Sequence, residues 1–317
     1  MAVNLSLLSN AAGLVSFRPA QALTDAFYAG RTERTIRAYQ QDLEDFRVFL
    51  GAQSTEEAAQ ALIGSDHGAA NGVALAYKAH LIERGLQPAT VNRRLAALRS
   101  IVKLARTLGL VAWTLEVEGM KLQAYRDTRG PGREAVSRMI GTASKRQDPK
   151  GARDSAIVRL MADMALRRGE VTGLDISDVD LQAGTVAILG KARTQKEALT
   201  LPEPTRAAIS AWITARGTEE GPLFINFDRA GKGKRLTGFS VARIVERLAE
   251  RAGTTARPHG LRHTAITEAL DAFKGDIRAV QRFSRHRDLR TLSVYDDNRR
   301  DMGGEVAKVV AEGYTHE

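Results

Sequence analysis

A histidine and an arginine share one short segment, HGLRHT, which begins at His259. On a helix, His259 and Arg262 stand at i and i+3, so their side chains lean over one patch of surface. Such a pair offers a proton-transfer group and a planar cation for an anionic ligand. His263 could form a zinc pair with His259, but no Glu or Cys completes a metal-ligand pattern, so no metal is expected.

A tyrosine ends a second basic segment, RHRDLRTLSVYDD, which runs from Arg285 to Asp297. Only 6 of the 317 residues are tyrosine. A free phenol has a pKa of about 10 and is a poor nucleophile at neutral pH. Because nearby guanidinium groups favour the phenolate, the segment predicts that Tyr295 enters a cationic pocket. Tyr314, in the tail GYTHE, is a rival nucleophile by residue type alone.

Two further segments rich in polar residues precede these two in the chain. The secondary-structure elements around the four segments must bring them together. ALRRGEVTGLDISDVD begins at Ala165, and ILGKARTQKEALTLP carries Lys191. Alternating and apolar patterns predict two short strands joined by the Lys-rich loop GKARTQKE. The strands are expected at 185–189 and 198–201, and helices at 152–166, from 170, at 205–216, at 238–252 and within 259–294.

The N-terminal half shows only helical periodicity, which predicts helices at 32–50, 73–84 and 88–108. In the third of these, apolar residues line one face and cations crowd the rest. No acidic residue stands among these cations, so we expect this face to contact a DNA backbone. The cations are Arg93, Arg94, Arg99, Lys103 and Arg106.

The expected fold is therefore mainly α with a small antiparallel β-sheet (α+β), in two domains. A tail at 1–19 precedes a helical DNA-binding domain at 20–114. A Gly-, Pro- and charge-rich linker at 115–133 leads to a mixed catalytic domain at 134–317, which ends in a tail helix.

Composition sets broader limits. The formal net charge is +10, with 47 Lys and Arg against 37 Asp and Glu, which suits a polyanionic partner. The absence of cysteine excludes disulfides, thiolate nucleophiles and Cys-based metal sites. No leader peptide or membrane-spanning run is recognised, so we expect a cytoplasmic protein that associates with the nucleoid of a prokaryote.

In their order and spacing, the four segments resemble the conserved boxes of the tyrosine site-specific recombinases, which include phage integrases and the Xer and Cre recombinases. L-R-x-x-E matches Leu166 to Glu170, and H-x-L-R-H matches His259 to His263. A histidine followed nine positions later by a tyrosine matches His286 and Tyr295, and Lys191 stands where the family has its hairpin lysine. In the N-terminal half, T-x-x-x-Y-x-x-D-L-x-x-F and G-L-x-P-A-T-V-N-R-R-L resemble the family's core-binding domain.

The resemblance implies a role for each matched residue. Arg167 and Arg262 would clamp the non-bridging oxygens of a DNA phosphodiester, and Tyr295 would attack its phosphorus. His259 and His286 would add hydrogen bonds or proton transfer. Lys191 would protonate the leaving 5′-oxygen, with Lys196 as a rival. Glu170 and His263 would support the site, with Glu170 holding Arg167 or His259 in place.

The resemblance also implies a reaction and an assembly. Two transesterifications through a 3′-phosphotyrosyl intermediate would cut and rejoin double-stranded DNA without cofactor or ATP. The active form would be a homotetramer on two DNA sites, with the C-terminal helix docked in trans and with accessory DNA-bending proteins as possible partners. Integration, excision and resolution are all open as roles. A catalytically silent DNA-binding protein and a type IB topoisomerase are the alternatives.

The chain departs from the family pattern beside the last histidine. Relatives usually carry Leu-Gly at the positions of Ser284 and Arg285, and Asp296 and Asp297 follow the tyrosine where relatives often have a small polar residue and a histidine. Neither change removes a catalytic group. The packing of His286, and a phosphate contact by Arg285, are the points that these changes leave open.

Overall fold

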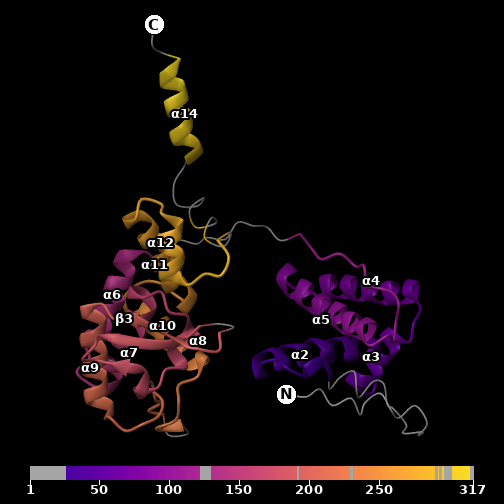
Figure 1. Ribbon diagram of the computed structural model, residues 1–317, viewed down its shortest axis with the longest axis horizontal. Coiled ribbons are helices and arrows are strands. Elements are labelled where there is room, and N and C mark those ends of the chain that lie inside the picture. The colour runs from indigo at the N-terminus through magenta and orange to yellow at the C-terminus, as the bar shows by residue number, and fades with distance from the viewer. Residues whose placement is uncertain are drawn as a thin grey trace, which may run out of the picture. The chain divides into compact units, whose positions relative to one another are not determined.

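The computed structural model describes residues 26–121, 130–190, 193–228, 231–289, 292, 295 and 302–314. They belong to two compact units that divide between Ala124 and Tyr125, each with its own hydrophobic core (Figure 1). Helices dominate the described residues, and a three-stranded antiparallel sheet accompanies them. The expected fold class is therefore confirmed.

Helices alone build the described part of the N-terminal unit. The named ones are α2 (Glu33–Leu50), α3 (Thr55–Ile63), α4 (His67–Glu83) and α5 (Pro88–Thr107). The first three begin at side-chain caps: Thr32, Ser54 and Asp66 each accept a hydrogen bond from a backbone N–H of the first turn. A cap of this kind contributes about 1 kcal/mol.

The predicted helices at 32–50 and 88–108 are confirmed as α2 and α5, while α4 begins earlier than the predicted 73–84. The sequence analysis missed α3, although its start carries a recognisable signal. Ser54 Oγ accepts from the Glu57 N–H, and the Glu57 carboxylate accepts from the Gln53 N–H at 2.5 Å. This S-x-x-E pattern is close to a capping box.

The packed part of this unit continues past residue 114, into the stretch expected to be linker. Leu115 and Val117 are buried in the core of the unit. The side-chain amide of Asn92 donates to the Met120 carbonyl at 2.9 Å and accepts from the Met120 N–H at 2.6 Å. A Cβ at Gly119 would lie 2.7 Å from Asn92 Oδ1, so this close approach requires glycine.

The second unit places helices around one core. In chain order its elements are α6 (Arg133–Ser144), α7 (Pro149–Asp163), α8 (Arg168–Thr172), the 3-10 turn η2 (Ile176–Asp178), β1 (Val179–Asp180), β2 (Thr185–Leu189), β3 (Lys196–Thr200), α9 (Glu203–Arg216), α10 (Gly238–Arg251), α11 (Pro258–Ala272), α12 (Ile277–Ser284) and α14 (Met302–Gly313). The core centres on α7, which packs against α6, α9 and α11. α6 was not predicted, and α7 ends at Asp163 rather than at 166.

The sheet has the order β1-β2-β3, and the predicted hairpin is formed by β2 and β3. Val186 pairs with Leu199 and Leu189 with Lys196, so β3 begins two residues before the predicted 198. Val186 and Ile188 face the core, which is why this central strand alternates. Lys191 and Ala192, in the loop, lie outside the described residues.

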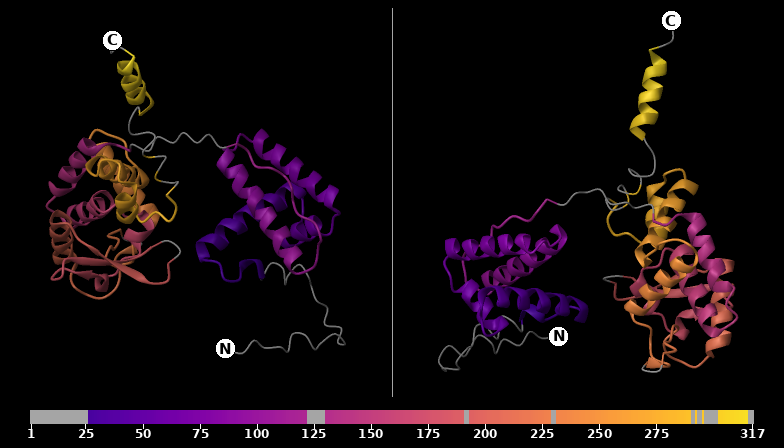
Figure 2. Two further views of the ribbon diagram at one scale, coloured as in Figure 1. Left: turned by 45° about the horizontal axis from the view of Figure 1, so that its top comes forward. Right: turned by 180° about the vertical axis from the view of Figure 1, so that it is seen from behind.

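A smaller cluster lies beside this core and gathers the C-terminal elements. α11 and α12 pack together (Figure 2), and their apolar residues enclose Leu292 and Tyr295. The expected tail helix is present as α14, whose described side chains are exposed, Val309 among them at 68%. In the described parts of the chain, no helix is long and apolar enough to cross a membrane.

Candidate active site

The first predicted arginine stands where the chain enters α8. After α7 the backbone turns through Ala165, which has a positive φ of 50°, and then reaches Arg167. The Glu170 carboxylate accepts from the Arg167 N–H and from Arg167 Nη1, both at 2.8 Å. Only 3% of the Glu170 side chain is exposed, against 30% for Arg167. Glu170 therefore holds Arg167 by two hydrogen bonds, and Arg167 keeps an open side.

Arg262, on α11, is almost wholly enclosed, at 1% exposed. It donates hydrogen bonds to the carbonyls of Ala165 and Ser284. Burial lowers its pKa to about 10, and the charges of Arg167 and Arg285 act in the same direction. The guanidinium still carries its proton at neutral pH, since about 10 remains well above 7. The buried cation therefore joins α11 to the turn before Arg167.

His286 follows α12 and faces Arg262. Its Nε2 lies 3.3 Å from Arg262 Nη2, and its Nδ1 lies 2.9 Å from Ser284 Oγ. A guanidinium can only donate, so Nε2 is the acceptor and Nδ1 carries the proton given to Ser284. Burial, followed by the charge of Arg262, lowers the pKa of His286 to about 4. His286 is thus a neutral imidazole at physiological pH, and the contact with Arg262 fixes its tautomer.

Tyr295 packs in the small cluster with only 4% exposed. Its ring centroid lies 5.1 Å from that of His263 and 6.1 Å from that of His286. The rings of His263 and His259 are 4.1 Å apart. The charge of the Tyr295 phenolate raises the pKa of Arg262.

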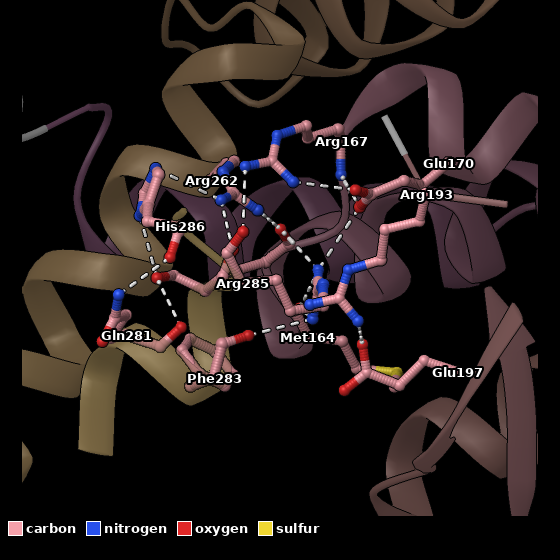
Figure 3. A network of polar contacts seen from close by, with 12 residues as sticks. Met164, Arg167, Glu170, Arg193, Glu197, Arg262, Gln281, Phe283, Arg285 and His286 are labelled. Atoms are coloured by element: carbon pink, nitrogen blue, oxygen red, sulfur yellow. Dashed lines mark hydrogen bonds and ion pairs between the residues drawn. The ribbon is translucent and has the colours of Figure 1, made fainter. Parts of the chain in front are cut away.

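The candidate site brings four predicted residues and one further arginine, Arg285, into one network (Figure 3). Figure 3 draws Arg167, Glu170, Arg262, Arg285 and His286 with the hydrogen bonds that connect them. Arg262 and Arg285 both donate to the Ala165 carbonyl. The rings of Tyr295, His263 and exposed His259 adjoin it. Among the described residues, no group of three His, Asp or Glu side chains is placed to hold a metal ion.

The two candidate general acids differ in what the structure describes. Lys191 lies outside the described residues. Lys196 is the first residue of β3, and its ammonium forms an ion pair with Asp178, a carboxylate that is 6% exposed. Proton donation by Lys196 would require this pair to break.

The cationic face of α5 is partly neutralised from within the N-terminal unit. Arg93 pairs with Asp42 at 2.6 Å, and Arg94 with Asp45 at 2.7 Å. The Arg94 side chain is only 11% exposed. Both acids belong to α2, so a search of the α5 segment alone could not reveal them. Lys103 is exposed and better suited to a phosphate contact than Arg94.

Arg99 also bonds within the unit, through Nη2 to the Val117 carbonyl at 3.1 Å.

The sequence analysis named Arg285 only as a point left open. Its side chain points inward, with 6% exposed. It bonds Glu170, which stands 115 positions away. No local pattern could indicate a contact over that separation. Tyr314 is 83% exposed and lies at the end of α14, outside the network described above.

Comparison with known proteins agrees with this arrangement. Residues 133–301 match the model of the phage integrase family, and residues 28–107 match the phage integrase N-terminal SAM-like domain. The chain is 40% identical over 288 residues to tyrosine recombinase slr0733 of Synechocystis, covering 89% of this chain and 92% of that one. It is 39% identical over 289 residues to tyrosine recombinase Synpcc7942_B2651 of Synechococcus elongatus, covering 89% and 90%.

Solved structures share the fold. A XerH site-specific recombinase bound to palindromic difH substrate has a TM-score of 0.66 at 18% identity, covering 92% of this chain and 85% of that one. A lambda integrase dimer bound to a COC′ core site has a TM-score of 0.65 at 14% identity, covering 90% and 95%. With two family models and two close relatives that span most of its length, the chain belongs to the phage integrase family of tyrosine recombinases.

Proposed function

We propose that this chain cleaves and rejoins duplex DNA at a defined site through a transient bond between Tyr295 and a DNA 3′-phosphate. The observation that carries the proposal is the network of Arg262, Arg167 and neutral His286 next to the Tyr295 ring. Two guanidinium groups and an imidazole suit the charge that develops on a phosphodiester under attack.

The chemistry balances in two steps. In the first, the Tyr295 phenol passes its proton to a histidine of the site and its oxygen attacks phosphorus, the bond from phosphorus to the 5′-oxygen breaks, and Lys191 gives that oxygen a proton. In the second, the 5′-hydroxyl of a partner strand returns its proton to Lys191 and attacks the phosphotyrosine, and the released phenol recovers its proton from the histidine. The ester bond keeps the energy of the broken phosphodiester, so no ATP is needed.

Arg262 and Arg167 would serve the phosphate differently. Arg262 is enclosed and already bonded to two carbonyls, so it would act mainly as a fixed positive charge. Arg167 has an exposed fraction of 30% and can turn donors toward a non-bridging oxygen. His286 would need to release Arg262 and gain a proton on Nε2 before it could donate to the phosphate.

The assembly that we propose is a homotetramer on two DNA sites. The solved relatives in complex with DNA include a lambda integrase dimer, which supports a multimeric form on DNA. The exposed valines of α14 offer a short apolar face that would dock on a neighbouring protomer. Accessory DNA-bending proteins belong to the same proposal.

Recombination is distinguished from its two alternatives by one assay on two plasmids, one with paired target sites and one without. The sites would first be located by footprinting DNA that flanks the gene for this chain. A recombinase yields rearranged plasmids only from paired sites. Relaxation of both plasmids without rearrangement would favour a topoisomerase, and binding without any strand breakage would favour a silent DNA-binding protein.

A further inference from the structure

Arg285 adopts a backbone conformation that favours glycine. It ends α12 with φ 55° and ψ 39°, in the left-handed region. A non-glycine residue in this region costs roughly 1 kcal/mol. The chain therefore keeps a long charged side chain where a glycine would be more stable locally. The contacts of this side chain must offset the cost of the backbone conformation.

The Arg285 side chain lies buried among backbone carbonyls. Nη1 donates to the Phe283 carbonyl at 2.9 Å, and Nη2 donates to the Ala165 carbonyl at 3.2 Å. Both nitrogens lie 3.3 Å from the Met164 carbonyl. Arg285 thus ties the end of α12 to the turn that precedes Arg167. An outward contact with DNA phosphate is not available to it in this arrangement.

Two arginines share one carboxylate here. Glu170 Oε1 accepts from Arg167 Nη1 at 2.8 Å, and Glu170 Oε2 lies 3.3 Å from Arg285 Nη2. With both guanidiniums present, the three groups carry a net charge of +1. Without Arg285, Glu170 and Arg167 would neutralise each other, and the Arg167 guanidinium would have to balance the buried carboxylate by itself.

Arg285 also connects the two arginines of the predicted clamp. The Ala165 carbonyl accepts from Arg285 Nη2 and from Arg262 Nη1. The Arg285 carbonyl lies 3.4 Å from Arg167 Nη2 and accepts from it. A change at Arg285 therefore reaches both arginines without touching the phosphate itself.

We propose that Arg285 is a positioning residue for DNA cleavage: it offsets the charge of Glu170, so that Arg167 stays available to the scissile phosphate, and it fixes the Met164–Ala165 turn on which Arg262 depends. This inference rests on the proposed function. It predicts that Arg285 matters for the rate of strand cleavage and little for DNA affinity.

The test compares Arg285→Gly with wild type on a nicked duplex that traps the covalent adduct. Glycine suits the left-handed backbone, which offsets part of the stability lost with the buried side chain, and the melting temperature of each variant is measured beside its cleavage rate. Lys274→Gly is the matched control, because Lys274 also has a positive φ, of 52°, and is an exposed cation away from the network. Arg285→Lys, a second variant, retains the charge and loses the paired donors.

We expect adduct formation by Arg285→Gly to be at least tenfold slower, with DNA affinity within twofold of wild type. Arg285→Lys should recover part of the rate, and Lys274→Gly should match wild type. In a Glu170→Gln background, Arg285→Gly should slow cleavage much less, because the carboxylate charge that Arg285 offsets is absent.

An unchanged rate in Arg285→Gly overturns the inference. So does an equal slowing by Arg285→Gly with and without Glu170→Gln, or a slowing that only parallels a lower melting temperature. If wild type itself forms no adduct on DNA that it binds specifically, the proposed function fails instead, so the two failures are distinguishable.

Discussion

At the scale of single residues, the candidate active site is held by hydrogen bonds from cations to backbone carbonyls. Arg262 bonds the carbonyls of Ala165 and Ser284, and Arg285 bonds those of Met164, Ala165 and Phe283. Both Nε atoms are buried without a hydrogen-bond partner among the described residues. Burying each guanidinium costs desolvation free energy, which the hydrogen bonds to the carbonyls offset in part. The arrangement provides a positive electrostatic field at the site.

His286 should make the stability of the catalytic unit depend on pH. Its pKa falls from 6.5 to about 4 on folding, so between these values the unfolded chain binds a proton that the folded chain does not. Stability from this group is complete above pH 6.5 and is lost as the pH falls toward 4. His286→Gln, which does not titrate, should flatten the profile over this window.

The measurement is urea unfolding at pH 4.5 to 7.5, monitored by tryptophan fluorescence. The chain has 2 tryptophans, and Trp113→Phe leaves Trp212, in the core of the catalytic unit, as the reporter. His67→Gln, at an exposed histidine of the other unit, is the control. Parallel profiles with and without His286 would contradict the predicted neutral imidazole.

At the scale of elements, the β2–β3 hairpin separates two lysines by position. Leu189 and Lys196 pair across it, so Lys196 belongs to the ladder, while Lys191 comes between these two residues in the sequence. The ion pair with Asp178 then occupies the Lys196 ammonium. Of the two candidates, Lys191 is therefore the one that we propose as the general acid.

We expect Lys191→Ala to slow cleavage on the order of 100-fold, the usual scale for general acid catalysis. A substrate with sulfur in place of the 5′-bridging oxygen needs no proton on departure, so it should restore the rate of this variant. Lys196→Ala is the comparison variant and should retain most of the activity. Loss of cleavage in Lys196→Ala that the sulfur substrate repairs would exchange the two roles.

Patterns within single elements predicted much of the fold, and contacts between elements account for what was missed. The helices α2 and α5 and the β2–β3 hairpin follow from periodicity and turn residues. The pairing of Arg93 with Asp42 spans 51 positions, and no pattern on α5 could indicate it. The sharing of Glu170 by Arg167 and Arg285 likewise depends on folding, because it joins α8 to the end of α12.

At the scale of the whole molecule, we propose that one unit serves DNA contact and the other serves cleavage. The N-terminal unit carries the basic face of α5, and the second unit carries the network around Arg262. Family boxes along the chain predicted both units, because their order and spacing are preserved even where single boxes are weak patterns. The burial of Leu115 and Val117 shows that the first unit packs residues beyond the predicted bound of 114.

Removal of α14 should separate cleavage from assembly. A chain ending at residue 301 keeps the network and Tyr295, so adduct formation on a single half-site should stay within about threefold of wild type. If α14 docks on a neighbouring protomer, the tetramer on paired sites and recombination should be lost. Native gel shifts and plasmid rearrangement measure both, and a truncated chain that still recombines would remove α14 from the assembly.

The most direct test of the account is to find the covalent bond itself. Wild type and Tyr295→Phe would be incubated with a nicked duplex that carries the footprinted site, followed by denaturation, proteolysis and mass spectrometry. The account predicts an SDS-resistant adduct with wild type only, mapped to the peptide that contains Tyr295. An adduct that persists in Tyr295→Phe, or that maps to Tyr314, would contradict the assignment of the nucleophile.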